Sequence, residues 1–307
     1  MSFFAILFAL LLEQARPLSP DNAIHKGLSH WAEWVRRNLD AGQAVHGWMA
    51  WGLAVALPAL LSCVIYWGIW LFSSVLAFIW LVAVLYLALG FRQFSHHFSQ
   101  IRQALEAGDD ALAREKLAGW LSIETGHLSR TEVLRLTIAQ SVLSAHCHVL
   151  GVLVAFVVLW VLGLGPAGAV LYRLSEYLGR HWRARTDGTH SPALCAAGAQ
   201  AWQWVDHVPA RTTALAFAVV GNFEEAVACW RSDAARFAPG SDGVILAAAA
   251  GALHVRLAAP SPLNDAESET RPEPQLAHLS SVVGLVWRSV VLWMLLLILL
   301  TLARLVG

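Results

Sequence analysis

The stretch from Trp48 to Gly90, WMAWGLAVALPALLSCVIYWGIWLFSSVLAFIWLVAVLYLALG, contains no charged side chain. At about 1.5 Å of rise per residue it would form one helix about 65 Å long, roughly twice the thickness of a hydrocarbon core. The stretch therefore has to fold back on itself. A glycine and two adjacent serines interrupt the apolar run between Trp67 and Ser74, which predicts a transmembrane hairpin over 48–68 and 73–90.

The composition of the whole chain is typical of a membrane protein. Of its 307 residues, 57% are hydrophobic and 14% are charged, against about 45–50% and about 25% in soluble domains. Mean hydropathy is +0.56. Lys+Arg and Asp+Glu both number 21, so no net charge attracts the chain to polyanions. These values exclude a disordered chain, a collagen-like chain and a nucleic-acid-binding protein.

Further apolar stretches predict more membrane segments. Residues 3–12 are expected to form a short embedded helix, and they lack the basic start and the cleavage site of a signal peptide. The others lie at 149–164 and 286–303, and the last predicts a C-terminal transmembrane helix. A further apolar stretch, 212–220, is too short to span unless 202–208 are included. The fold class is therefore all-α, a polytopic membrane helical bundle with about five membrane segments. Residues 1–307 are expected to form a single integral membrane domain.

The segments between the apolar stretches predict the topology. The helical loops 13–47 and 91–147 are rich in Lys and Arg, and the hairpin returns the chain to the same side. The positive-inside rule then places both loops in the cytoplasm, with the protein multi-pass in a bacterial inner membrane.

Helix start signals subdivide the polar parts. One of the two aspartates Asp109 and Asp110 is expected to cap the helix that starts near Ala111, and Thr131 is expected to cap the next helix. Asn222 is expected to start a helical surface segment over 222–257. The stretch 258–277 is rich in proline, serine and acidic residues, which predicts a flexible linker.

No motif assigns a nucleotide, a metal or a cofactor. A P-loop, a dinucleotide fingerprint and a nucleophile elbow are all missing from the sequence. His146, Cys147 and His148 are adjacent, and adjacent residues of a helix point about 100° apart, so the three side chains cannot face one ion. We therefore expect no metal site and no cofactor.

A tryptophan-rich segment puts Asp206, His207 and Arg211 next to apolar sequence. Charged side chains inside a membrane need partners. One interpretation is a buried polar clamp, in which Asp206 and Arg211 pair with each other or with Arg173, Glu176 or Glu13. The other is a pocket for a small anionic ligand or a lipid headgroup, built from the same residues.

Three short motifs resemble the CobD/CbiB family of integral membrane proteins. They are ALEAGDDALAR at 104–114, GAVLYR at 168–173 and VPAR at 208–211. The resemblance implies that the chain attaches an aminopropanol or its phosphate to cobyric acid during cobalamin assembly, using ATP. It also adds Arg114, the last residue of the first motif, to the candidate binding residues.

Several positions depart from the family pattern. The family has acidic or amide groups where this chain has Gln140, Trp202 and Gln203, and a Mg²⁺–nucleotide chemistry that loses its carboxylates is expected to lose its metal. The departures resemble an AmpE-like branch, whose LDWVPVR is similar to VDHVPAR at 205–211. That resemblance implies a membrane sensor or modulator linked to cell-wall status and β-lactamase regulation.

Three functions remain open on the sequence. The main interpretation is the AmpE-like sensor or modulator without catalysis of its own. The alternative is an ATP-dependent adenosylcobinamide-phosphate synthase, an amide-bond-forming ligase that joins cobyric acid to aminopropanol phosphate. The third is a carrier of small molecules or lipid headgroups. The expected partners are the lipid bilayer and a small anionic ligand or a membrane protein, and no nucleic acid.

Overall fold

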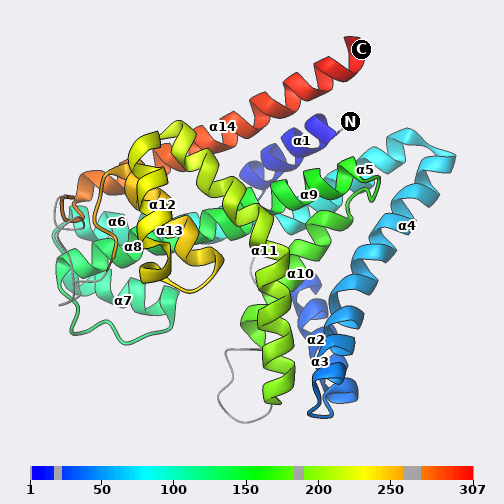
Figure 1. Ribbon diagram of the computed structural model, residues 1–307, viewed down its shortest axis with the longest axis horizontal. Coiled ribbons are helices and arrows are strands. Elements are labelled where there is room, and N and C mark those ends of the chain that lie inside the picture. The colour runs from blue at the N-terminus through cyan, green and yellow to red at the C-terminus, as the bar shows by residue number, and fades with distance from the viewer. Residues whose placement is uncertain (1, 17–22, 183–189, 259–270, 307) are drawn as a thin grey trace. The chain divides into compact units, whose positions relative to one another are not determined.

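The structure is a computed structural model that describes residues 2–16, 23–182, 190–258 and 271–306. In these residues every regular element is a helix and no β-strand occurs, which confirms the all-α fold (Figure 1). The chain divides into two compact units. The first unit contains residues 1–90 and 147–209, and the second unit contains 91–146 and 210–307. That residues 1–307 act as one integral membrane domain stays a prediction.

The first unit contains the predicted hairpin. Its elements are α1 (Ser2–Ala15), α2 (Ala23–Leu39), α3 (Ala44–Trp51), the π-helix η1 (Gly52–Ala56), α4 (Leu57–Phe72), α5 (Ser74–Ala88), most of the π-helix η2 (His146–Leu150), α9 (Gly151–Val161), α10 (Ala167–His181) and α11 (Pro192–Val220) as far as Pro209. The turn between α4 and α5 falls at Ser73, whose Oγ accepts a hydrogen bond from the N–H of Leu76. The hairpin is thus confirmed, and its bend lies in the expected interval.

Pro58 explains why a π-helix joins α3 to α4. Proline has no N–H, so the carbonyl of Ala54 cannot receive the usual bond from the residue four positions later. The backbone widens instead, and the N–H of Leu57 donates to the carbonyl of Gly52. Trp31 Nε1 donates to the Ala54 carbonyl at 3.4 Å. The helix therefore continues past the proline.

Two glycines allow α9 to approach α10 closely. A Cβ on Gly168 would lie 2.1 Å from the carbonyl oxygen of Ala155, and one on Gly151 would lie 2.1 Å from the hydroxyl of Tyr172. Only a residue without a side chain fits at either position, so these glycines fix the distance between the two helices.

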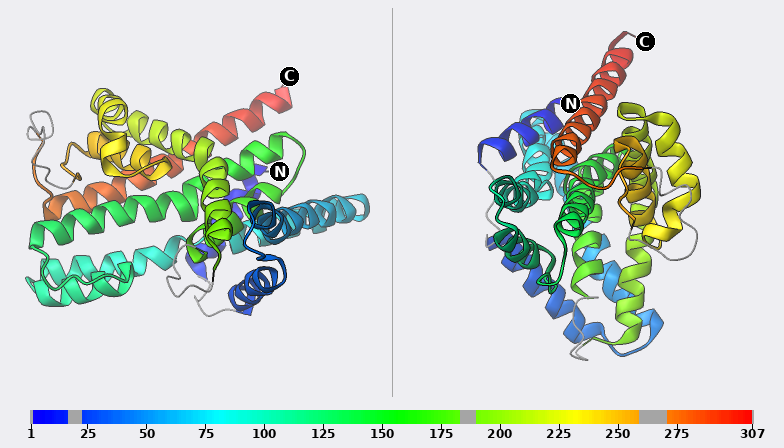
Figure 2. Two further views of the ribbon diagram at one scale, coloured as in Figure 1. Left: turned by 60° about the horizontal axis from the view of Figure 1, so that its bottom comes forward. Right: turned by 90° about the vertical axis from the view of Figure 1, so that its left-hand side faces the viewer.

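The second unit is built on three neighbouring helices and the C-terminal helix. Its elements are α6 (Phe91–Glu106), α7 (Asp110–Leu121), α8 (Arg130–Ala145), α11 from Ala210 onward, α12 (Phe223–Phe237), α13 (Ser241–Leu253) and α14 (Leu276–Val306). Helices α6, α7 and α8 lie side by side, and α14 packs along α8 and α6 (Figure 2).

The helix caps agree with the sequence at two places and differ at one. The side chains of Asp109 and Asn222 accept backbone hydrogen bonds at the starts of α7 and α12, as expected. The prediction that Thr131 caps the next helix is wrong. Ser129 caps α8 and forms a capping box with Glu132, because its extended backbone precedes the helix whereas Thr131 is already inside the helix.

The last third of the chain differs from the expectation in two ways. The segment 222–257 is helical, but α13 is not a surface helix: residues 243–251 are all buried, because α13 packs against α12 and α8. Helix α14 begins at Leu276, well before the expected start at 286, so the end of the expected linker is helical. The linker residues 259–270 lie outside the described part of the chain.

Three helices are long and apolar enough to cross a membrane. They are Ala44–Phe72, Arg130–Val161 and Leu276–Ala303, and shorter apolar helices cover Ser2–Ala15, Ser74–Ala88 and Ser241–Leu253. The second long helix begins inside the expected loop 91–147, earlier than the segment predicted from residue 149. The short apolar stretch 212–220 and residues 202–208 both lie in α11. This pattern of helices agrees with a helical membrane bundle.

Candidate functional site

A buried hydrogen bond links α10 to α11 in the first unit. The hydroxyl of Tyr172 donates to Oδ1 of Asp206 at 2.9 Å, and both side chains are fully buried. Burial raises the pKa of Tyr172 well above its ordinary value of 10, and the charge of Asp206 raises it further. The phenol therefore keeps its proton and acts as the donor. Gly151 provides the space in which the hydroxyl lies.

Two arginines hold the carboxylate of Glu176 on the same helix α10. Arg173 Nη1 lies 2.8 Å from Oε2, and Arg180 Nε lies 2.7 Å from Oε1. The carboxylate is 5% exposed, whereas Arg173 is 21% and Arg180 is 52% exposed. The spacing of three and four residues puts all three side chains on one face of the helix.

An apolar groove of about 270 Å³ lies beside this charged face. Arg173 belongs to its wall, and the other lining residues come from α2, α4, α5 and α10. Among them is Ser62, which is 6% exposed and whose hydroxyl has no hydrogen-bond partner in the described residues. The groove therefore combines an apolar surface with one cationic side chain and one buried hydroxyl.

Most of the predicted binding residues lie in the first unit. Arg173, Glu176 and Asp206 all lie on α10 and α11 in the first unit, and His207 is exposed on α11. Arg211 is exposed and belongs to the second unit, since the division falls after Pro209. The expected coupling between Asp206 and Arg211 stays a prediction.

Sequence reasoning missed two members of the cluster. Tyr172 lies inside the quoted motif GAVLYR, but nothing in the sequence shows that its hydroxyl faces Asp206. Arg180 was detectable, because it follows Glu176 by four residues on a helix and this spacing favours an ion pair.

Arg114 lies in the second unit and braces the loop between α7 and α8. Its Nε donates to the carbonyl of Leu128 at 2.7 Å, and its own carbonyl accepts a hydrogen bond from Thr125 Oγ1 at 2.8 Å. Arg114, the last residue of the ALEAGDDALAR motif, therefore stabilises the structure of this loop. Its role as a ligand-binding residue stays a prediction.

No metal ligands can be assigned. The described residues contain no group of three or more His, Cys, Asp or Glu side chains that could hold an ion. His146 Nδ1 instead lies 2.9 Å from Thr213 Oγ1 in the buried part of the second unit. In the first unit, Cys147 Sγ lies 3.2 Å from Nη2 of Arg180.

Comparisons of the sequence with a family model and with curated proteins indicate the same family. The sequence model of the CobD/CbiB protein family matches residues 3–302. The cobalamin biosynthesis protein CobD of Stutzerimonas stutzeri is 34% identical over 265 residues, which cover 84% of this chain and 82% of that protein. The cobalamin biosynthesis protein CobD of Chromobacterium violaceum is 34% identical over 217 residues, which cover 69% and 67%. No solved structure matches the chain.

These relatives contradict the main interpretation drawn from the sequence. Both are named as cobalamin biosynthesis proteins, so the prediction of a non-catalytic AmpE-like sensor or modulator is wrong. The AmpE-like resemblance rested on a short motif at 205–211, whereas the family match extends over nearly the whole chain. The departures at Gln140, Trp202 and Gln203 therefore do not remove the chain from the family. The chain belongs to the CobD/CbiB family.

Proposed function

We propose that the chain is an enzyme of cobalamin biosynthesis that forms the amide bond between cobyric acid and an aminopropanol or its phosphate. The names of the two relatives support a role in this pathway. The reaction is the one that the family resemblance implies, and its co-substrate is ATP. We further propose that the protein is multi-pass in the bacterial inner membrane.

The structural observation that carries the proposal is the charged face of α10. Arg173 and Arg180 bind the same carboxylate, that of Glu176, and Arg173 also lines the apolar groove. A substrate that presents a carboxylate, or a phosphate, can bind to these guanidinium groups. Arginine suits the task because its planar guanidinium can bind either anion through two parallel hydrogen bonds.

The neighbouring residues position this face. Glu176 fixes the orientation of both guanidinium groups, and the bond from Tyr172 to Asp206 holds α10 against α11. Arg173 directly follows Tyr172, so the buried pair also determines where Arg173 projects. In this proposal Arg173 and Arg180 bind the anionic substrate, whereas Tyr172, Glu176 and Asp206 are positioning residues.

Complementation tests the proposal. In a bacterial strain that lacks its own cobyric-acid coupling activity, the wild-type gene should restore growth on cobyric acid. Arg173→Gln should abolish the rescue, and Arg173→Lys, which keeps the charge but loses the planar donors, should restore it partly. Arg37→Gln is the matched control, because this arginine also pairs with a glutamate on its own helix but lies on α2.

The membrane content of each variant is measured by immunoblot, so that loss of protein is distinguished from loss of activity. A wild-type protein that accumulates in the membrane and fails to restore growth would contradict the proposed reaction. Full rescue by Arg173→Gln would contradict the assignment of the substrate-binding residue.

A further inference from the structure

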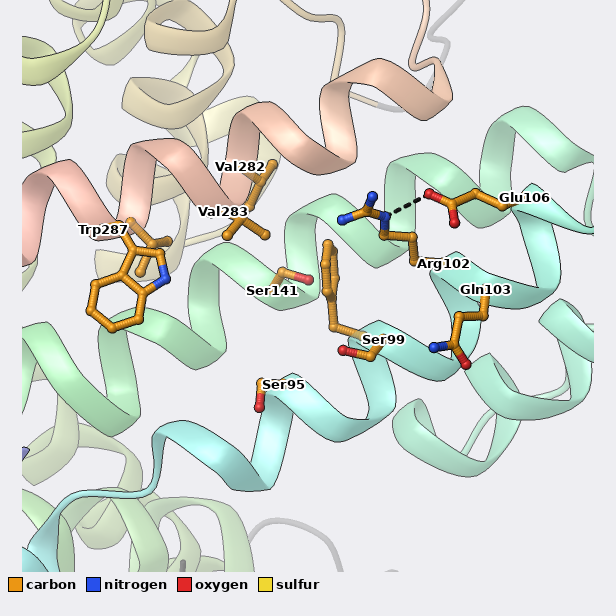
Figure 3. Close-up of a pocket in the computed structure, with 11 residues that line it drawn as sticks. Ser95, Ser99, Arg102, Gln103, Glu106, Ser141, Val282, Val283 and Trp287 are labelled. Carbon is orange, nitrogen blue, oxygen red and sulfur yellow. Dashed lines mark hydrogen bonds and ion pairs between the residues drawn. The ribbon is translucent and has the colours of Figure 1, made fainter. Parts of the chain in front are cut away.

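A cavity of about 380 Å³ in the second unit has two chemically different walls (Figure 3). Helix α6 contributes mostly polar side chains together with Phe98, and the facing part of α14 contributes apolar ones. The lining residues are Ser95, Phe98, Ser99, Arg102, Gln103 and Glu106 of α6, Ser141 of α8, and Val282, Val283, Val286 and Trp287 of α14. The polar side chains of α6 cannot satisfy their hydrogen bonds against the apolar side chains of α14. A ligand with a polar and an apolar part can contact both surfaces.

The polar wall is one stripe of α6. Ser95, Ser99, Arg102 and Glu106 follow one another at spacings of four, three and four residues, which puts them on one side of the helix. Arg102 Nε donates to Glu106 Oε1 at 2.7 Å, and the two side chains are 42% and 49% exposed. The pair carries no net charge, so it offers a cation and an anion side by side.

The guanidinium of Arg102 has further donors. Figure 3 shows its two terminal amino groups on the side away from Glu106. Within the described residues these amino groups have no protein partner, and neither does the hydroxyl of Ser99 one turn earlier. Arg102 and Ser99 therefore present donors that suit a phosphate, and Glu106 presents acceptor oxygens next to them.

The apolar wall belongs to a helix that is long and apolar enough to cross a membrane. Trp287 lines the cavity and Arg288 follows it, and both residue types are common where a helix passes from hydrocarbon to headgroups. The valines continue the same surface. A ligand whose polar end lies on α6 would thus have its apolar end along α14.

We propose that this cavity binds the headgroup of a phosphatidylethanolamine molecule. The phosphate accepts hydrogen bonds from Arg102 and Ser99, the primary ammonium donates to Glu106, and the acyl chains lie along Val282, Val286 and Trp287. A phosphatidylglycerol headgroup has the phosphate and no ammonium for Glu106. A phosphatidylcholine headgroup has a quaternary ammonium, which cannot donate a hydrogen bond.

Native mass spectrometry of the full-length protein in detergent tests the proposal. Lipids with identical acyl chains and ethanolamine, glycerol or choline headgroups are added separately, and lipid-bound protein is counted. The ethanolamine lipid should bind most tightly. Arg102→Gln should weaken its binding by about tenfold or more, the usual effect of losing a hydrogen bond to a charged group.

Two more variants separate the parts of the site. Glu106→Gln should remove the preference for ethanolamine over glycerol headgroups, because it leaves the cation and neutralises the anion. Arg37→Gln, which removes an arginine from an ion pair of the same spacing on α2, should bind all three lipids as the wild type does. Thermal melting of each variant in detergent verifies that it is folded.

Three results would overturn the proposal. One is equal binding of the three lipids by the wild type. Another is unchanged ethanolamine-lipid binding by a folded Arg102→Gln variant. The third is binding of glycerophosphoethanolamine, which has the headgroup and no acyl chains, as tightly as the lipid, since the apolar wall would then have no role.

Discussion

Tyr172 and Asp206 make their hydrogen bond in a fully buried setting, where such a bond to a charged acceptor has its largest effect. We expect Tyr172→Phe to lower the free energy of unfolding by about 1.5–3 kcal/mol, because a buried carboxylate loses a donor. Melting of the protein in detergent measures the change. In a double-mutant cycle with Asp206→Asn, the two changes in the free energy of unfolding should be clearly non-additive.

Tyr86→Phe is the matched control for that cycle. Its hydroxyl donates to the backbone carbonyl of Arg16, a neutral acceptor, and the tyrosine is only half-buried. Its loss should therefore cost less than the loss of the Tyr172 hydroxyl. Additive effects in the cycle would show that Tyr172 and Asp206 do not act as a pair.

Glu33 on α2 gives a prediction that depends on pH. The hydrogen bond from Arg36 lowers its pKa from the ordinary 4.5 to about 2, and a second bond from Arg37 assists, against the opposing effect of partial burial. Because the pKa is lower in the folded protein, the stabilisation is complete above pH 4.5 and is lost as the pH falls towards 2. Glu33→Gln should thus lower the melting temperature at pH 6.

The melting temperatures of the wild type and of Glu33→Gln are then compared at lower pH, which tests whether the charge of Glu33 is responsible. The difference in melting temperature between the wild type and Glu33→Gln should shrink as the pH falls below 4.5. A difference that stays constant down to pH 3 would mean that the charge of Glu33 does not stabilise the fold.

At the scale of elements, the contact between α9 and α10 depends on Gly168. A methyl group there would lie 2.1 Å from the backbone oxygen of Ala155, which cannot turn away as a side chain can. Gly168→Ala should therefore destabilise the protein by about 1–3 kcal/mol, the usual cost of overpacking. Gly68→Ala on α4 is the control, because a Cβ at that position has no atom within 4 Å.

The Gly68→Ala variant should melt at or slightly above the wild-type temperature, since alanine favours a helix more than glycine does. Equal melting of both alanine variants would show that α9 and α10 can separate without loss of stability. Melting curves of the purified protein in one detergent compare the three proteins directly.

At the scale of the whole molecule, the three long apolar helices and the family assignment make the chain a membrane protein. The orientation is a prediction from the basic loops 13–47 and 91–147. A cysteine introduced at Gln103 should react with a membrane-impermeant maleimide only after the inner membrane is opened. A cysteine at Ser74, next to the tip of the hairpin, should react in intact spheroplasts.

Of the natural cysteines, three are buried and Cys195 is partly exposed, so Cys195→Ser provides the background for this labelling. Labelling of the Gln103 position in intact spheroplasts would reverse the predicted orientation. Labelling of both positions from outside would mean that the hairpin does not cross the membrane.

Features that depend on neighbouring residues or on segment length can be predicted from the sequence. The uncharged stretch 48–90 had to form a hairpin, because one straight helix would exceed the membrane thickness. Asp109 and Asn222 cap helices through bonds to backbone only three residues away. The motifs at 104–114, 168–173 and 208–211 indicate the family that the comparisons show, whereas the missing carboxylates predict a function that the names of the relatives contradict.

Which residues meet across long stretches of sequence depends on how the helices pack. Tyr172 and Asp206 are 34 residues apart, and their bond depends on how α10 packs against α11 and on the space left by Gly151. The position of α13 was predicted at the surface, and its burial follows from packing on α12 and α8. Side-chain pairing across helices depends on their distance and rotation, which no local pattern of residues specifies.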